Sequence, residues 1–158
     1  MPSIRRAVQA DGPEILNLIR ELADYEKLSP PDDDAAARLL TDAFGAVPRF
    51  EIFLAIEGET VAGYAFIFET YSTFLALPTL YIEDIFVREA YRKHGIGKAL
   101  FQHCVAEAHA RGCGRLDWVV LDWNQSAIEF YQRQGGKYLA EWQLYRITRE
   151  EIAALIEG

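Results

Sequence analysis

The stretch that decides the fold of this 158-residue chain lies between residues 81 and 98. It begins with Tyr81-Ile82-Glu83-Asp84-Ile85-Phe86-Val87, a largely apolar run typical of a buried strand. After a short connection follows Arg92-Lys93-His94-Gly95-Ile96-Gly97-Lys98, a glycine turn that opens the next helix. The first turn of a helix has unpaired N–H groups and a partial positive charge, and glycine lets the backbone approach an anion closely. The stretch therefore predicts a strand, turn and helix that bind phosphate, with three basic side chains beside it.

Three phosphate-binding patterns compete for this turn. A Walker A loop needs Gly at position 92 and Ser or Thr at position 99, where this chain has Arg92 and Ala99. A dinucleotide fingerprint needs a third Gly at position 100, which is Leu100. The remaining pattern, Arg-x-x-Gly-x-Gly, resembles the one that binds the pyrophosphate of coenzyme A in the GNAT acetyltransferases. This pattern alone does not exclude the alternative that the glycine turn only precedes a helix and binds no phosphate.

A second segment, residues 121–135, resembles the later GNAT motif. Asn124 follows a predicted strand, and Tyr131 lies on the next helix ahead of Gly135. The resemblance implies that Asn124 binds the pantetheine arm and that Tyr131 lies near the thioester sulfur. From that position we expect Tyr131 to donate a proton to the departing thiolate. A helix N-cap for Asn124 and a packing role for Tyr131 are the structural alternatives, and both are compatible with function.

The resemblance extends over nearly the whole chain. Residues 19–26, 81–84 and 122–124 are similar to the diamine (spermidine/spermine) acetyltransferase group. Within that group, residues 27–29 and 71–73 are more similar to the thialysine acetyltransferase branch. The polyamine enzymes have an acidic residue in the place of Ser72, so the resemblance implies a shorter acceptor than a long polyamine.

The flanking sequence predicts the other elements from apolar periodicity and from Gly and Pro breaks. Asp11 and Glu14 form a capping-box pattern at the start of a helix that ends near Lys27, and Thr148 with Glu151 forms another. The expected strands cover residues 4–8, 50–56, 60–71, 79–87, 115–121 and 138–147, and the expected helices begin near residues 12, 31, 96, 125 and 149. This order predicts an α/β fold with helices on both faces of a sheet. The resemblance implies the GNAT type, a mixed and mostly antiparallel twisted sheet, in a single N-acetyltransferase domain over residues 1–158.

Candidate site residues follow from this alignment and from the chemistry of amines. A primary amine has a pKa of about 10.4, so it must lose a proton before it attacks a thioester carbonyl. Glu83 is a candidate for a base acting through water, or for a charge that only holds the ammonium. The other expected substrate-binding residues are Tyr25, Glu26, Ser72 and Asp84, with a solvated helix end as the alternative for Glu26. The expected cofactor-binding residues are Ile85, Phe86, Val87, Arg92, Lys93, His94, Gly95, Ile96, Gly97, Lys98 and Asn124.

In this assignment a backbone N–H from Ile85, Phe86 or Val87 meets the developing oxyanion, so no side chain is needed for that task. His94 contacts the cofactor or lies on the surface. Cys113 has no base beside it, and His103 and His109 lie on different faces of one helix, so we expect neither a nucleophilic cysteine nor a metal site.

Composition narrows the function classes. The formal net charge is −8, from 24 acidic and 16 basic residues, which argues against nucleic-acid binding and suits a cationic substrate as well as simple solubility. Two cysteines are too few for a disulfide framework, and no apolar run approaches the roughly 20 residues of a membrane span. We therefore expect a cytoplasmic protein without membrane or nucleic-acid partners, and the resemblance implies a homodimer.

These observations predict an enzyme that moves the acetyl group of acetyl-coenzyme A directly to a primary amine of a small cationic substrate. Thialysine-like amino acids, diamines and polyamines are the candidate acceptors. The alternatives are acetylation of a protein amine and a coenzyme A-binding sensor without catalysis.

Overall fold

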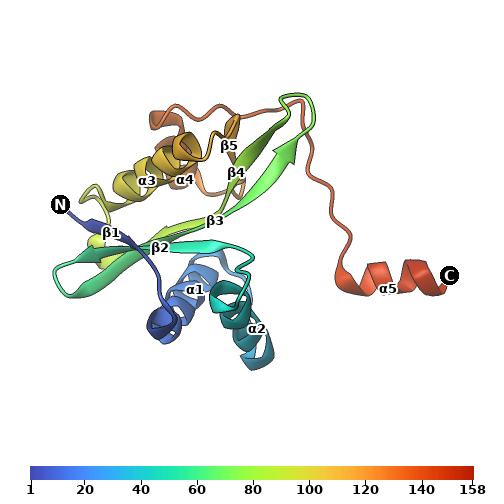
Figure 1. Cartoon of the computed structure of the whole chain (residues 1–158), viewed down its shortest axis with the longest axis horizontal. Helices are drawn as coiled ribbons and strands as arrows, with labels where there is room; N and C mark the ends of the chain where they lie inside the picture. Colours follow the sequence, from blue (N-terminus) through green and yellow to red (C-terminus); the bar gives the residue numbers. More distant parts are fainter. The chain divides into compact units, whose positions relative to one another are not determined.

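A computed structural model describes all 158 residues of the chain. The chain forms two compact units, Met1–Val119 and Val120–Gly158, and each is described by itself. Figure 1 traces the order of the elements along the chain.

The first unit is built on one five-stranded sheet in the order β1-β2-β3-β4-β5. The strands are β1 (Ser3–Arg6), β2 (Glu51–Glu57), β3 (Thr60–Ser72), β4 (Leu77–Val87) and β5 (Arg115–Trp118). The first four strands are antiparallel to their neighbours, and only β4 and β5 run parallel. The predicted mixed, mostly antiparallel sheet is therefore confirmed.

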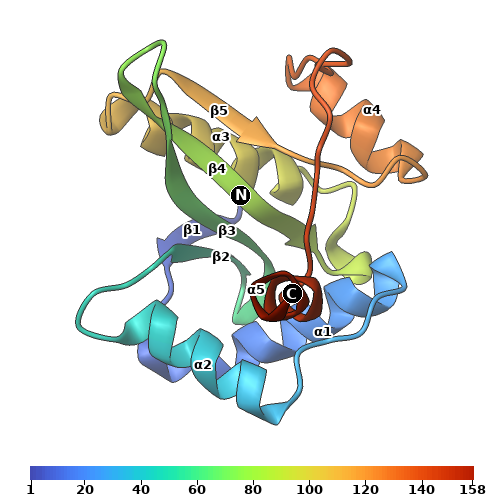
Figure 2. The ribbon, with the colours of Figure 1, turned by 90° about the vertical axis from the view of Figure 1, so that its right-hand side faces the viewer.

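Helices cover both faces of this sheet, as the sequence predicted (Figures 1 and 2). The helices of the first unit are α1 (Gly12–Glu26), α2 (Asp33–Phe44) and α3 (Ile96–Ala110), with short 3-10 turns at Gln9–Asp11 and Glu89–Tyr91. On the α1 face, Ile52 and Leu54 of β2 join Ile15 and Leu18 in the main core cluster. Between them, Phe53 faces α3, where its ring centroid lies 4.3 Å from that of His103. Because both faces are buried, the strands read as nearly continuous apolar runs.

The start of α1 differs from the predicted capping box. The Asp11 side chain does not cap this helix. Its carboxylate accepts hydrogen bonds from Arg5 at 2.8 Å and from the Val8 N–H at 2.7 Å. The Glu14 carboxylate likewise accepts a hydrogen bond from Nη1 of Arg88 at 2.6 Å. Both carboxylates therefore pair with arginines from other elements and do not cap the helix. Such long-range partners cannot be read from the local sequence.

The second unit contains α4 (Gln125–Arg133) and α5 (Arg149–Glu157). The capping box at α5 is confirmed, since the Thr148 N–H donates to Glu151 at 2.7 Å and the Glu151 N–H donates to Thr148 at 3.3 Å. The predicted strand over residues 138–147 is wrong, because this segment has no strand structure, and β5 ends at Trp118 instead of residue 121. A strand needs a hydrogen-bonded neighbour, and this unit has no other strand to supply one. None of the helices in the structure combines the length and hydropathy of a membrane span.

Candidate active site

The glycine turn between β4 and α3 has the backbone expected of an anion site. Gly95 has a φ of 81°, in the left-handed region that favours glycine, and Lys93 also has a positive φ of 67°. The first turn of α3 has no side-chain cap and no acidic residue. Its N–H groups have no partners within the helix and are available to an anion. The predicted strand, turn and helix are therefore present, and their chemistry fits a phosphate.

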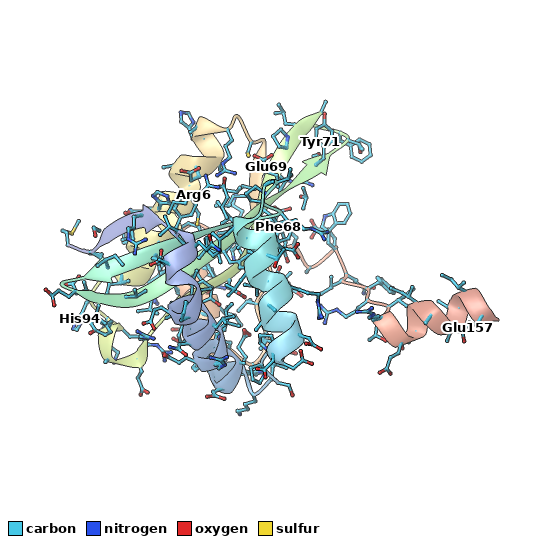
Figure 3. The ribbon with its side chains drawn as sticks, turned by 60° about the horizontal axis from the view of Figure 1, so that its bottom comes forward. Arg6, Phe68, Glu69, Tyr71, His94 and Glu157 are labelled. Atoms are coloured by element: carbon cyan, nitrogen blue, oxygen red, sulfur yellow. The ribbon has the colours of Figure 1, made fainter.

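Exposed basic side chains surround this turn. Lys93, His94 and Lys98 are all exposed, whereas Ile96 is buried and anchors α3 to the sheet. Figure 3 shows His94 at the outer edge of the molecule. The lysines add positive charge where the net charge of the chain would otherwise repel a phosphate.

Arg92, the first residue of the motif, turns inward instead. Its Nε donates a hydrogen bond to the Val87 carbonyl at 2.9 Å. Its guanidinium carbon lies 4.8 Å from the ring centroid of Tyr25 and 5.6 Å from that of Phe86. The charge of Arg92 therefore faces the C-terminal end of α1, and the side chain links the glycine turn to that helix.

The backbone of β4 is open on one side beyond Ile82. β5 pairs with β4 only from Thr79 to Ile82, while β3 follows β4 as far as Val87. The Arg88 N–H donates to the Ala62 carbonyl at 2.9 Å, which makes residues 62 and 88 a hydrogen-bonded pair. Such pairs alternate along an antiparallel ladder, so the backbone of Phe86 pairs with β3, whereas the N–H groups of Ile85 and Val87 point to the open edge. Of the three residues expected to present an N–H to the acetyl group, Ile85 and Val87 have the suitable orientation.

A β-bulge lies at Glu83, beside Asp84. Ile82 pairs with Ile67 of β3 and Asp84 pairs with Phe66, so Glu83 has no partner on β3. A bulge interrupts the alternation that would otherwise send residues 83 and 84 to opposite faces. The Asp84 carboxylate accepts a hydrogen bond from the buried hydroxyl of Tyr64 at 3.0 Å, on the face covered by α1.

Three carboxylates, Glu26, Glu83 and Asp84, influence one another electrostatically and are called the acidic cluster below. Burial raises the pKa of Asp84 to about 6, the hydrogen bond from Tyr64 opposes this rise, and the charges of Glu83 and Glu26 add to it. Burial, followed by the charge of Glu83, also raises the pKa of Glu26. An organic cation bound here would relieve the repulsion among the carboxylates, so the cluster is suited to an ammonium group.

Ser72 lies apart from this cluster. It pairs with Leu77 next to the β3–β4 turn, six residues along β3 from Phe66, the partner of Asp84. At about 3.3 Å per residue, this separation is roughly 20 Å. Ser72 is buried, and its hydroxyl accepts a hydrogen bond from the Leu75 N–H at 3.2 Å. Within this chain its position supports a role in the β3–β4 turn and does not support contact with a substrate at the acidic cluster.

The remaining expected residues, Asn124 and Tyr131, belong to the second unit. The Asn124 side chain accepts a hydrogen bond from the Ala127 N–H at 3.2 Å, so the N-cap role expected as an alternative is confirmed. The partly buried ring of Tyr131 lies edge-on to Phe130, with 5.2 Å between the ring centroids.

Comparison with known proteins identifies the family. A sequence model of the Acetyltransferase (GNAT) family matches residues 14–136. The chain belongs to the GNAT acetyltransferase family. This GNAT acetyltransferase is 36% identical over 163 residues to a thialysine N-epsilon-acetyltransferase of Bos taurus, an alignment that covers 96% of this chain and 95% of the relative. It is 44% identical over 95 residues to an L-ornithine N5-acetyltransferase of Arabidopsis thaliana, covering 60% of this chain and 42% of the relative.

A solved structure supports the fold. An integron cassette protein from the mobile metagenome of V. cholerae matches with a TM-score of 0.86 at 24% identity, over 99% of this chain and 98% of that protein. The predicted family, its thialysine branch and the GNAT fold are thus confirmed. The acetyltransferase is an N-acetyltransferase enzyme, as the sequence predicted.

Tyr64 of β3 contacts the acidic cluster and was not predicted from the sequence. It is fully buried, with 0% of its surface exposed, and its hydroxyl reaches Asp84. The available signal was indirect: a tyrosine in the middle of an apolar strand needs a polar partner for its hydroxyl. That partner becomes apparent only when the register of β3 and β4 is known.

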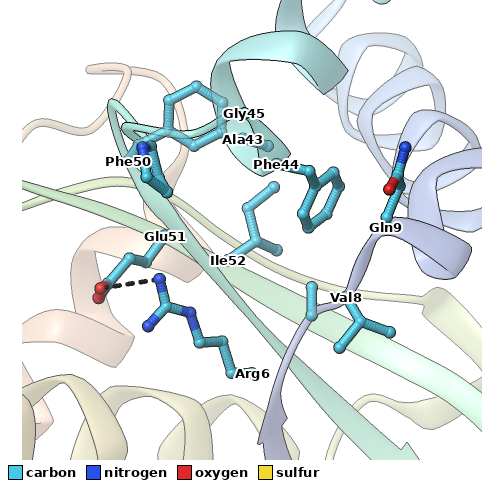
Figure 4. Close-up of a pocket in the computed structure, with 11 residues that line it drawn as sticks. Arg6, Val8, Gln9, Ala43, Phe44, Gly45, Phe50, Glu51 and Ile52 are labelled. Atoms are coloured by element: carbon cyan, nitrogen blue, oxygen red, sulfur yellow. Dashed lines mark ion pairs between the residues drawn. The ribbon is translucent and has the colours of Figure 1, made fainter.

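A cavity of about 350 Å³ lies elsewhere in the first unit, between β1, β2 and the end of α2 (Figure 4). Its wall includes Phe44, Phe50 and Ile52, and the ion pair between Arg6 and Glu51, 3.1 Å long, lies on one side. None of the predicted site residues lines it, so the candidate active site is distinct from this cavity.

Proposed function

We propose that this acetyltransferase moves the acetyl group of acetyl-coenzyme A to a primary amine of a small cationic acceptor, by direct attack. The observation that supports this best is the acidic cluster beside the open edge of β4. Its carboxylates suit an ammonium group, and the neighbouring N–H groups of Ile85 and Val87 suit the oxygen of an acyl group.

Acetyl-coenzyme A fits the glycine turn. The N–H groups at the start of α3 and the exposed Lys93 and Lys98 would hold its phosphates, while Gly95 keeps the backbone open to them. When bound, the cofactor supplies the acetyl group as a reactive thioester. The resemblance assigns the pantetheine arm to Asn124, whose capping role at α4 is compatible with this second task.

The residues of the acidic cluster would bind and deprotonate the acceptor. Glu26 and Asp84 hold its positive charge, and Tyr25 forms one wall. Glu83, which is exposed, either receives a proton through water or adds to the charge that binds the ammonium. Tyr131 is the proposed acid that protonates the departing thiolate.

The preferred acceptor in this proposal is a diamino acid of the thialysine or ornithine type. Both named relatives act, by their names, on amino acids with a side-chain amine. Diamines and polyamines are the neighbouring acceptor class. The proposal further includes one catalytic domain over residues 1–158, which the family match across the boundary of the two units supports. A cytoplasmic homodimer is proposed from the resemblance, and light scattering on the purified chain tests the dimer.

Thiol release tests the function. The enzyme is mixed with acetyl-coenzyme A and a panel of thialysine, ornithine, putrescine, spermidine and a lysine-containing peptide, and free thiol is followed. We expect the highest kcat/KM for a diamino acid. Coenzyme A binding without thiol release on any amine would contradict the proposal and indicate a sensor, and a preference for the peptide would indicate a protein acetyltransferase.

A further inference from the structure

Tyr64 joins the hydrophobic core to the acidic cluster. Its ring belongs to the core cluster with Ile15 and Leu18, and its centroid lies 6.4 Å from that of Phe86. Its hydroxyl is the one polar group of the side chain, and it donates to the Oδ2 atom of Asp84 at 3.0 Å. A ring fixed by packing on all sides holds this hydroxyl, and therefore the carboxylate, in one place.

We propose that Tyr64 is a positioning residue that acts through Asp84, fixing its carboxylate beside Glu26 and Glu83 so that Asp84 receives the proton that the acceptor ammonium must release. This inference rests on the proposed function. It assigns the proton to Asp84, which is partly buried, whereas Glu83 is exposed to water. Because Tyr64 occupies Oδ2, the Oδ1 atom remains for the incoming proton.

The step balances in protons and electrons. One N–H bond of the ammonium breaks, its proton forms an O–H bond on Asp84, and the electron pair stays on nitrogen. Nitrogen then bonds to the acetyl carbon while the C–S bond breaks, and the electron pair of that bond leaves with sulfur. Tyr131 gives its hydroxyl proton to the thiolate. The second proton that leaves nitrogen as the amide forms restores the Tyr131 hydroxyl through water, and the proton on Asp84 returns to solvent.

The groups that face Asp84 suit it to this task. Burial raises its pKa to about 6, which makes it a better proton acceptor than an ordinary aspartate. Glu83 from its own strand and Glu26 from α1 raise the pKa further, and Tyr64 from β3 lowers it. Burial, and next the charge of Asp84, raise the pKa of Tyr64 well above its usual value, so Tyr64 keeps its proton and remains a donor.

Arg88 and Arg92, which follow β4, have other partners. Arg88 pairs with Glu14 at 2.6 Å and with Glu21 at 2.9 Å. Arg92 is stacked over Tyr25. The positive charge that would complete the acidic cluster is thus the acceptor's own ammonium.

The test follows the titration of Asp84 by 13C NMR of its carboxyl carbon in Tyr64→Phe, which keeps the ring and removes the hydroxyl. The pKa of Asp84 should rise by roughly 1 unit, because a hydrogen bond to the charged form is lost. Glu83→Gln should lower it, since a repelling charge is removed. Tyr71→Phe is the matched control on the same strand, where the side chain is exposed, and should change neither the titration nor the activity.

The pH profile of kcat/KM for the best amine should show the same shifts. Its lower apparent pKa should rise in Tyr64→Phe and fall in Glu83→Gln. An unchanged Asp84 titration in Tyr64→Phe would overturn the role of Tyr64. If the pKa of Asp84 shifts but the lower apparent pKa of kcat/KM does not, the role of Asp84 as proton acceptor is overturned. If Tyr64→Phe does not fold, biosynthetic 3-fluorotyrosine, a stronger donor, should lower the pKa of Asp84, and an unchanged value would contradict the proposal. The NMR readout needs no acetyl transfer, so failure of the proposed function is seen separately, as absence of thiol release on every amine.

Discussion

The guanidinium of Arg92 lies over the ring of Tyr25, with 4.8 Å between the guanidinium carbon and the ring centroid. Arg92 begins the glycine turn, and Tyr25 belongs to the last turn of α1, 67 positions earlier in the sequence. One side chain therefore connects the glycine turn to α1, the helix that carries Glu26. A change at Arg92 should be detected mainly at the acceptor site.

Arg92→Ala should raise KM for the amine several-fold with a smaller change in the affinity for coenzyme A. The substitution removes the cation–π contact with Tyr25, which contributes about 0.5–2 kcal/mol. Lys98→Ala is the matched comparison and should weaken coenzyme A binding in a manner that depends on salt. Steady-state kinetics and calorimetric titration measure both. A collapse of coenzyme A affinity in Arg92→Ala with an unchanged KM for the amine would show that Arg92 binds phosphate directly.

Gly95→Val should abolish tight binding of acetyl-coenzyme A. A Cβ at Gly95 would meet no atom within 4 Å, so the expected cost comes from its φ of 81°, which a β-branched residue rarely adopts. The turn would change its path and withdraw its N–H groups from the phosphates. Gly95→Asn is the control, because asparagine tolerates this region and should retain most of the affinity. Equal affinities for Gly95→Val and the wild type, in a titration of the folded proteins, would refute the assignment of this turn.

Tyr131→Phe should lower kcat by about 10²–10⁴-fold, the usual contribution of a general acid. The ring and its edge-on contact with Phe130 remain, so binding of acetyl-coenzyme A should change little. Single-turnover thiol release is the measurement. Tyr145→Phe, an exposed tyrosine of the same unit, is the control. If Tyr131→Phe turns over at nearly the wild-type rate, Tyr131 is not the general acid and only packs.

Much of the fold was predictable from the sequence because the signals are local. The glycine turn, the capping box at Thr148 and the apolar runs of β2, β3 and β4 each specify their structure within a few residues. The predicted strand at 138–147 failed because β structure depends on a hydrogen-bonded neighbour, which local sequence does not reveal. The predicted cap at Asp11 is wrong for a related reason. Asp11 pairs with Arg5 of β1, and the local sequence does not reveal that the two residues meet.

The site was predictable only in part. Resemblance suggested Glu26 and Asp84, and the chemistry of amine deprotonation suggested Glu83, but strict alternation along β4 would send residues 83 and 84 to opposite faces. The bulge at Glu83 interrupts this alternation, and it depends on the register with β3, which strand periodicity does not fix. Ser72 is the buried last residue of β3, and its expected contact with a substrate stays a prediction.

Asp84→Asn should stabilise the protein at neutral pH. The pKa of Asp84 is about 6 in the folded state and 3.8 for an ordinary aspartate, so the folded state binds the extra proton between these values. The wild type should therefore lose stability as the pH rises from about 4 to 6, by up to about 3 kcal/mol. The stability of Asp84→Asn should not fall over this range, because asparagine does not titrate. Urea unfolding at pH 4 and pH 7 measures it, and an equal stability difference between the two proteins at both values would contradict the prediction.

The most direct test of the acceptor site is kcat/KM for a diamino acid in Asp84→Asn, measured by thiol release at pH 7.5 and compared with the wild type. The account predicts a loss of roughly 30-fold or more, because removing one partner of a partly buried charge pair costs about 2–5 kcal/mol. The affinity for coenzyme A should remain within about 2-fold, since the glycine turn is untouched. An unchanged kcat/KM in a folded variant that binds coenzyme A normally would contradict the account, because the acceptor ammonium would then bind away from the acidic cluster.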